Sequence, residues 1–442
     1  MNSIRALKKK TVLREATPSI FLVLNSFVWY IFTYAVFYSI VNELNFIETE
    51  KLTLFTIYYV GVAVSILIGS KLFPRSRNNA IGLWLFIGTI ATFLLTIVSS
   101  TNLLADAGIT FFLGAALGIG LPSCLSYFAD STTVENRGFV GGISWSIVGF
   151  AVLIFAFSTN MLGPLETIIA LTIWRLFGGI VFLILGGKKK KFIAQKSISY
   201  LELIRKKAIL LYLFPWIMFS IINFAEVPLL ESVFGANFVF LEIVEYAIIG
   251  VVAVVGGTIA DIAGRKRVVI AGFIMLGIEY AVLSVFSNSS AVLYLFLALD
   301  GTTWGLLFSV FLTAIWGDLG ENYEKEKYYT LGGLPFLLGG FLSILIRPYA
   351  SGISTIVAFS FASFFLFLAV IPLMYAPETL PERTMKDRDL KSYTEKALKA
   401  AQKETEKNRK KPKTQEKPEK EAEELKETPE EAAARKLAEK YY

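Results

Sequence analysis

Residues 256–267 read Gly-Gly-Thr-Ile-Ala-Asp-Ile-Ala-Gly-Arg-Lys-Arg, and they close an apolar run that begins near residue 236. The glycines allow a tight helix end, and the basic cluster anchors the following turn at lipid headgroups. Asp261 stands where its carboxylate can accept hydrogen bonds from the N-terminus of a neighbouring helix. The stretch therefore predicts the end of a membrane helix, followed by a turn that is held against a second helix.

The charged loops of the first half of the chain recur in the second half at a single offset of 188 residues. When one offset aligns several loops, the two halves of the chain are expected to be fused copies of one unit. The repeated unit is six apolar runs long. The pairs in this frame are Gly69 with Gly257, Arg77 with Arg265, Asp130 with Asp318, Arg137 with Lys325, and Glu43 with Glu231.

The composition places the chain in a lipid bilayer. Of its 442 residues, 55% are hydrophobic and only 18% are charged, which is more apolar surface than one water-soluble core can hide. The apolar runs are continuous, which excludes the short alternating strands of an outer-membrane barrel. Each run is about 20 residues or longer, enough to span the bilayer as a helix. The twelve runs are 19–42, 52–70, 79–99, 101–128, 138–162, 164–187, 208–230, 236–260, 268–287, 291–317, 328–350 and 354–376.

These runs predict an all-α membrane protein with twelve transmembrane helices in two pseudo-symmetric six-helix bundles. We expect an N-terminal bundle over 1–187, an amphipathic linker over 188–207, a C-terminal bundle over 208–376 and a charged tail over 377–442. The tail has too few large apolar side chains to fold alone, so we expect it to be solvated or to dock a cytoplasmic partner.

The distribution of Lys and Arg predicts the orientation. With the N-terminus in the cytoplasm, nearly all basic loop residues lie on the cytoplasmic side, and only Lys51 lies in the opposite loops. Both termini are therefore expected to be cytoplasmic, in a multi-pass protein of the cytoplasmic membrane.

The 256–267 stretch resembles the loop signature of the major facilitator superfamily, Gly-x-x-x-Asp-x-x-Gly-Arg-Lys/Arg. The Asp130 to Arg137 spacing and Pro377-Glu378-Thr379 resemble loop motifs of its sugar-porter branch, and the resemblance covers residues 1–380. It implies that cytoplasmic charges form a gate between the bundles, although the basic members could be simple membrane anchors. Phe73 replaces the expected Asp in the first-half loop, so the network should be asymmetric. The implied gate residues are Gly257, Asp261, Gly264, Arg265, Asp130, Arg137, Asp318 and Lys325.

Charged residues within the spans are costly and are candidate functional sites. In the superfamily that the chain resembles, spans 1, 4, 7 and 10 surround a central cavity, which leaves Arg175 and Glu279 on peripheral spans. Glu242 and Glu245 share one helix face, and Glu245 and Asp300 reach a similar depth. Such a pair can exchange a proton near neutral pH, or it can be satisfied by partners on other helices. The candidate proton-coupling or cavity residues are Asp300, Glu245, Glu242, Glu226, Arg347 and Asn223.

These features predict a secondary transporter that moves a small solute by alternating access and is driven by protons. A uniporter or an exporter of amphipathic or cationic compounds is the nearest rival, because the seventh span has Asn223 but lacks the Gln of sugar porters. The alternative outside transport is a membrane scaffold or receptor that recruits a partner through its tail. The chain has no His and a single cysteine, Cys124, so we expect no enzyme activity, no metal and no cofactor. No nucleic-acid partner is expected.

Overall fold

The computed structural model describes residues 2–99, 102–159, 161–186, 196–287 and 289–381, together with Thr394. The chain divides into two compact units, Met1–Arg388 and Asp389–Tyr442, and Thr394 is the only described residue of the second unit. The predicted tail beyond residue 381 therefore lies outside the described residues, apart from Thr394.

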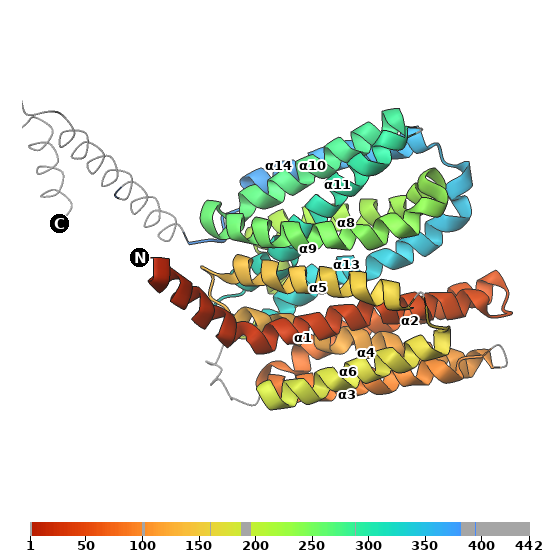
Figure 1. Ribbon diagram of the computed structural model, residues 1–442, viewed down its shortest axis with the longest axis horizontal. Coiled ribbons are helices and arrows are strands. Elements are labelled where there is room, and N and C mark those ends of the chain that lie inside the picture. The colour runs from red at the N-terminus through yellow and green to blue at the C-terminus, as the bar shows by residue number, and fades with distance from the viewer. Residues whose placement is uncertain are drawn as a thin grey trace, which may run out of the picture. The chain divides into compact units, whose positions relative to one another are not determined.

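The first half of the chain forms one bundle of long helices (Figure 1). Its members are apolar for about 20 residues or more, as a helix that crosses a bilayer must be. We refer to them as the first bundle. They are α1 (Asn2–Glu43), α2 (Glu48–Leu72), α3 (Arg77–Leu94), α4 (Leu103–Asp130), α5 (Arg137–Thr159) and α6 (Pro164–Leu185).

The second half repeats this arrangement, and we refer to it as the second bundle. Its tenth span is a composite in which a π-helical segment, η4, separates α11 from α12. The members are α8 (Lys207–Phe234), α9 (Phe238–Ala263), α10 (Arg265–Phe286), α11 (Ser290–Leu306), η4 (Leu307–Ile315), α12 (Trp316–Leu319), α13 (Lys325–Ile346) and α14 (Thr355–Tyr375).

The predicted twelve spans are confirmed. Eleven stretches of the described chain are long and apolar enough to cross a membrane, and one of them, Lys207–Ala263, has 57 residues and contains both α8 and α9. The chain reverses at Gly235, whose φ of 54° lies in the left-handed region. As a result, Tyr212 near the start of α8 donates to the carbonyl of Pro377, and Arg265 after the end of α9 donates to the adjacent Glu378.

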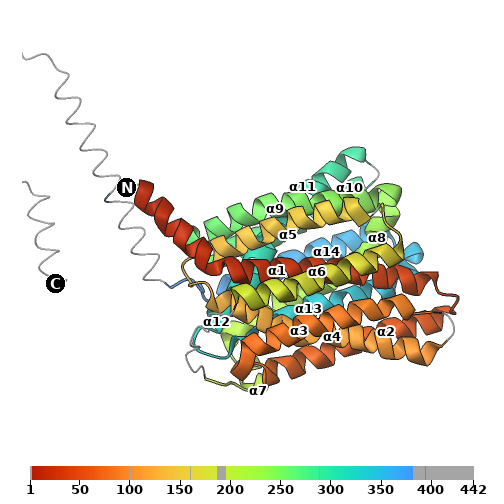
Figure 2. The ribbon, with the colours of Figure 1, turned by 60° about the horizontal axis from the view of Figure 1, so that its bottom comes forward.

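The two bundles meet chiefly along α5 and α9, with further contact between α2 and α13 (Figure 2). Glycines allow α5 and α9 to approach backbone to backbone: a Cβ on Gly257 would overlap the carbonyl of Gly138, and a Cβ on Gly149 would overlap that of Tyr246. A neighbouring contact between the bundles is aromatic: Trp145 of α5 stacks on Phe308 of η4, with ring centroids 4.1 Å apart. This interface brings the charged ends of the two bundles together.

The predicted linker is described only from residue 196 onward. It contains the short helix α7 (Tyr200–Ile204), and the Tyr200 hydroxyl lies 2.5 Å from the Ser70 hydroxyl of the first bundle. Burial raises the pKa of the Tyr200 hydroxyl above its usual range. Lys206 donates to the Tyr328 hydroxyl of the second bundle at 3.2 Å. The linker thus contacts both halves.

Candidate functional site

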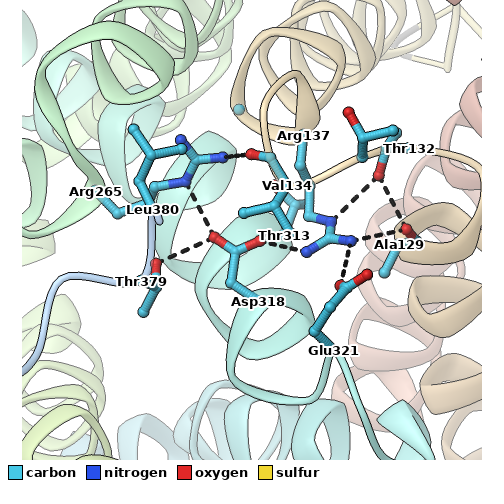
Figure 3. A network of polar contacts seen from close by, with 12 residues as sticks. Ala129, Thr132, Val134, Arg137, Arg265, Thr313, Asp318, Glu321, Thr379 and Leu380 are labelled. Atoms are coloured by element: carbon cyan, nitrogen blue, oxygen red, sulfur yellow. Dashed lines mark hydrogen bonds and ion pairs between the residues drawn. The ribbon is translucent and has the colours of Figure 1, made fainter. Parts of the chain in front are cut away.

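Asp318, in the short helix α12, is the centre of a buried charge network (Figure 3). Its carboxylate pairs with Arg137 of the first bundle and accepts from Nε of Arg265 at 3.1 Å. The Thr379 hydroxyl, which follows α14, also donates to it at 3.1 Å. Because Arg137 belongs to one bundle and Asp318 to the other, the pair fastens the two bundles together.

The guanidinium of Arg137 is saturated with acceptors. Besides Asp318 it donates to the Ala129 carbonyl at 3.0 Å, the Thr132 hydroxyl at 3.2 Å and the Glu321 carboxylate at 3.0 Å (Figure 3). Matching the charge and the donors in this way offsets the cost of burying the arginine.

A second set of ion pairs lies beside the first. Arg77 at the start of α3 pairs with Asp130 at the end of α4, and its Nε donates to Glu326 of the second bundle at 2.5 Å. Lys325 donates to Asp130 at 2.9 Å, again across the bundles. Glu326 is not among the residues predicted from the sequence, and Arg77 is predicted only to be the repeat partner of Arg265. We call the end of the two bundles that carries both sets the basic face.

Asp261 joins the basic face through the backbone. It accepts from the amides of Gly138 at 3.0 Å and Phe139 at 2.7 Å, at the N-terminus of α5, and pairs with Arg265 at 2.8 Å. Gly264 has a φ of 104°, and a Cβ there would overlap Glu378. Glu378 in turn accepts from the amide of Arg265 at 2.9 Å. The structure thus brings together all the residues that the loop resemblance implied.

A second candidate site is a group of buried carboxyls in the second bundle, formed by Glu245 of α9, Glu279 of α10 and Asp300 of α11. Their residues are 8%, 1% and 7% exposed, so water is almost excluded. Asp300 interacts electrostatically with both glutamates. Within the part of the chain that the structure describes, both oxygens of Glu279 and Oδ1 of Asp300 have no hydrogen-bond partner. We call these three residues the carboxyl cluster.

Sequence reasoning left Glu279 aside because it lies on a span expected to be peripheral. The helix is peripheral, but its buried face packs against α11 and carries Glu279 toward Asp300. The sequence feature that identifies Glu279 as a candidate is its charge, since a carboxylate in an apolar span rarely faces lipid.

The other predicted cavity residues are scattered. Glu226 of α8 is buried with one unpartnered oxygen, Glu242 is exposed one turn from Glu245, and Asn223 is half-buried. Arg347 follows α13 and pairs with Glu231 at the end opposite the basic face, where both side chains are partly exposed. Arg347 therefore already has a carboxylate partner.

Within the described ranges, no group of three or more His, Cys, Asp or Glu side chains is arranged to hold a metal ion. The side chains of the carboxyl cluster are therefore not arranged to hold a metal ion together.

Comparison with known proteins gives two findings. A family model described as the Major Facilitator Superfamily matches residues 19–315. Among solved structures, the human organic anion transporter MFSD10 (TETRAN) is similar with a TM-score of 0.58 over 82% of this chain and 99% of that chain, at 12% identity. At that identity the likeness shows the fold alone. No curated protein matches.

Proposed function

Since this chain belongs to the major facilitator superfamily and is a multi-pass membrane transporter, we propose that it couples the movement of a small solute to protons by alternating access. The observation that carries the proposal is the carboxyl cluster, in which both oxygens of Glu279 and Oδ1 of Asp300 are buried without a hydrogen-bond partner among the described residues. The cytoplasmic gate is assigned to the basic face, and the solute path to the space between the bundles.

The basic face supports the gating half of the proposal. Its cross-bundle pairs include Arg137 with Asp318, Lys325 with Asp130 and Arg77 with Glu326, and they can exist only while the two bundle ends are together. The positive-inside rule assigns this end to the cytoplasm. The described conformation is then one in which the cytoplasmic side is closed, and opening it must separate these pairs.

The carboxyl cluster supports the proton-coupling half. A carboxylate that is charged, buried and without donors costs several kcal/mol, whereas a protonated one is neutral. Glu245, Glu279 and Asp300 therefore cannot all be ionised in the closed interior. Opening of the path to water changes this balance, which links proton uptake and release to the conformational cycle.

The test uses purified protein in liposomes that contain a pH-sensitive dye, with solutes added one chemical class at a time. A transported solute should move protons in the same experiment. Asp300→Asn and Glu245→Gln keep side-chain shape but cannot titrate, so they should lose accumulation against a gradient and retain counterflow exchange.

Glu48→Gln is the matched control, because Glu48 is an exposed carboxylate whose side chain is 91% accessible. It should transport as the unmodified protein does. If both cluster variants still concentrate solute under an imposed pH gradient, proton coupling does not use this cluster. The alternative function, a membrane scaffold acting through the tail, is supported neither by the family nor by the fold.

A further inference from the structure

The second bundle carries an apolar groove between α8 and α13. Ile217 and Ile221 line it from α8, Leu334 and Leu338 line it from α13, and its volume is about 250 Å³. That volume is smaller than the roughly 300–1,000 Å³ of pockets that take drug-sized ligands. The groove is therefore suited to a narrow hydrocarbon chain rather than to a whole solute.

The groove exists because α13 has small residues where it faces α8. Pro335 and Gly339 line it without a side chain long enough to fill it. A larger residue does not fit at Gly339, because a Cβ there would overlap the ring of Phe224. The one hydroxyl in the lining, that of Ser220, already donates to the Trp216 carbonyl at 2.9 Å. The lining therefore requires no polar partner and favours an apolar occupant.

The groove lies on the face of α8 that is directed toward lipid. Leu210, Phe214, Ile217 and Ile221 recur every three or four residues, so they share one face, and they are between 36% and 53% exposed. Lys207, at the start of α8, continues this spacing and is exposed. At about 1.5 Å per residue, the helix rises about 15 Å from Lys207 to Ile217, which is half of a hydrocarbon core of about 30 Å. A lipid whose headgroup lies at Lys207 can therefore reach the groove with an acyl chain.

Basic side chains surround the point where α8 begins. Arg205 and Lys207 are exposed there, and so is Lys71 at the end of α2, whose Nζ lies 6.0 Å from the centre of the Tyr200 ring of α7. The short helix α7 contains one acidic residue, Glu202. The local charge is thus net positive, which attracts the anionic headgroups of a membrane surface.

The helix α7 also presents apolar side chains beside these charges. Leu201 is 63% exposed and Ile204 is 41% exposed, and Leu72 at the end of α2 is 63% exposed. The hydroxyl contact of Tyr200 with Ser70, at 2.5 Å, holds α7 against α2. Exposed apolar residues next to basic ones are typical of a segment that lies at the lipid headgroups.

We propose that α7, the start of α8 and the groove form one binding site for an anionic phospholipid of the leaflet at the basic face. The phosphate contacts Arg205 and Lys207, and one acyl chain follows the exposed face of α8 into the groove. The inference goes beyond proton coupling and does not require it, because the lipid is bound and not transported.

The experiment uses the full chain in phosphatidylcholine liposomes that contain a trace of photoreactive lipid. Two probes, phosphatidylglycerol and phosphatidylcholine, carry the same diazirine on one acyl chain, and mass spectrometry of peptides locates the adducts. We expect phosphatidylglycerol to label the groove more strongly. Each basic residue near an anionic headgroup contributes about fivefold, equivalent to ~1 kcal/mol. The double replacement of Arg205→Gln and Lys207→Gln should therefore bring the two probes close to equal labelling.

Labelling at Phe364, a 58% exposed residue of α14, is the internal reference for lipid that is not held in a site. Leu338→Trp fills the groove and should lower its labelling relative to Phe364. Arg267→Gln is the matched control, because Arg267 is an exposed arginine at the start of α10, and it should keep the preference. The proposal is overturned if both probes label the groove equally, if Leu338→Trp leaves its labelling unchanged, or if the double variant at Arg205 and Lys207 keeps the preference.

Discussion

At the scale of single residues, Asp318 and Asp261 of the basic face are expected to differ in how much stability is lost when each is replaced. Asp318 neutralises two fully buried arginines, whereas Asp261 pairs with only one of them and accepts from two backbone amides, one of which an Asn oxygen can still serve. Removing one partner of a buried ion pair costs about 3–5 kcal/mol. We therefore expect Asp318→Asn to lower the free energy of unfolding by that amount and Asp261→Asn by clearly less, as measured by thermal unfolding. Equal losses would contradict this ranking.

In the carboxyl cluster, by contrast, removal of a single charge is expected not to reduce stability. Glu279 has no hydrogen-bond partner and lies near Asp300 and Glu245, so its charge is stabilised by nothing that the structure describes. Glu279→Gln should leave the melting temperature unchanged or raise it, while the number of protons moved per solute falls. The two quantities are measured by thermal unfolding and by dye-reported proton flux. A drop in melting temperature would mean that the carboxylate has a structural role.

At the scale of helices, the contact between α5 and α9 depends on the absence of side chains. A Cβ on Gly257 would overlap the Gly138 carbonyl, which belongs to backbone and cannot rotate away. Gly257→Val should therefore force the two helices apart and increase the reactivity of an engineered cysteine at the basic face. Gly108 of α4 has nothing within 4 Å, so Gly108→Ala is a matched control that should be neutral or slightly stabilising. A closed, unreactive basic face in Gly257→Val would show that the close approach is dispensable.

At the scale of the whole molecule, residues 377–379 after α14 are hydrogen-bonded to the membrane bundles. The Pro377 carbonyl accepts from Tyr212, Glu378 caps the start of α10, and Thr379 donates to Asp318. A chain that ends at residue 388 keeps these contacts, and a chain that ends at 376 loses them. We expect uptake per folded molecule to persist in the longer chain and to fall in the shorter one, as measured in liposomes. Loss of uptake in the longer chain would instead assign a role in transport to residues 389–442.

The sequence by itself determined the twelve helices and the duplicated plan. A bilayer requires about 20 apolar residues per helix and satisfied backbone groups, and both conditions are local and visible in residue order. It also indicated Gly257, Asp261, Gly264 and Arg265 of the basic face, because their loop motif is contiguous in the sequence. It could not indicate that Arg77 meets Glu326, that Glu279 reaches Asp300, or that α11 continues into a π-helix. Those arrangements were decided by the tertiary structure, because each depends on how helices distant in sequence pack against one another. Arg175 is the clearest case: its position in an apolar span is evident from the sequence, but only packing places it between Trp29 and Trp84 with no carboxylate among the described residues to offset its charge.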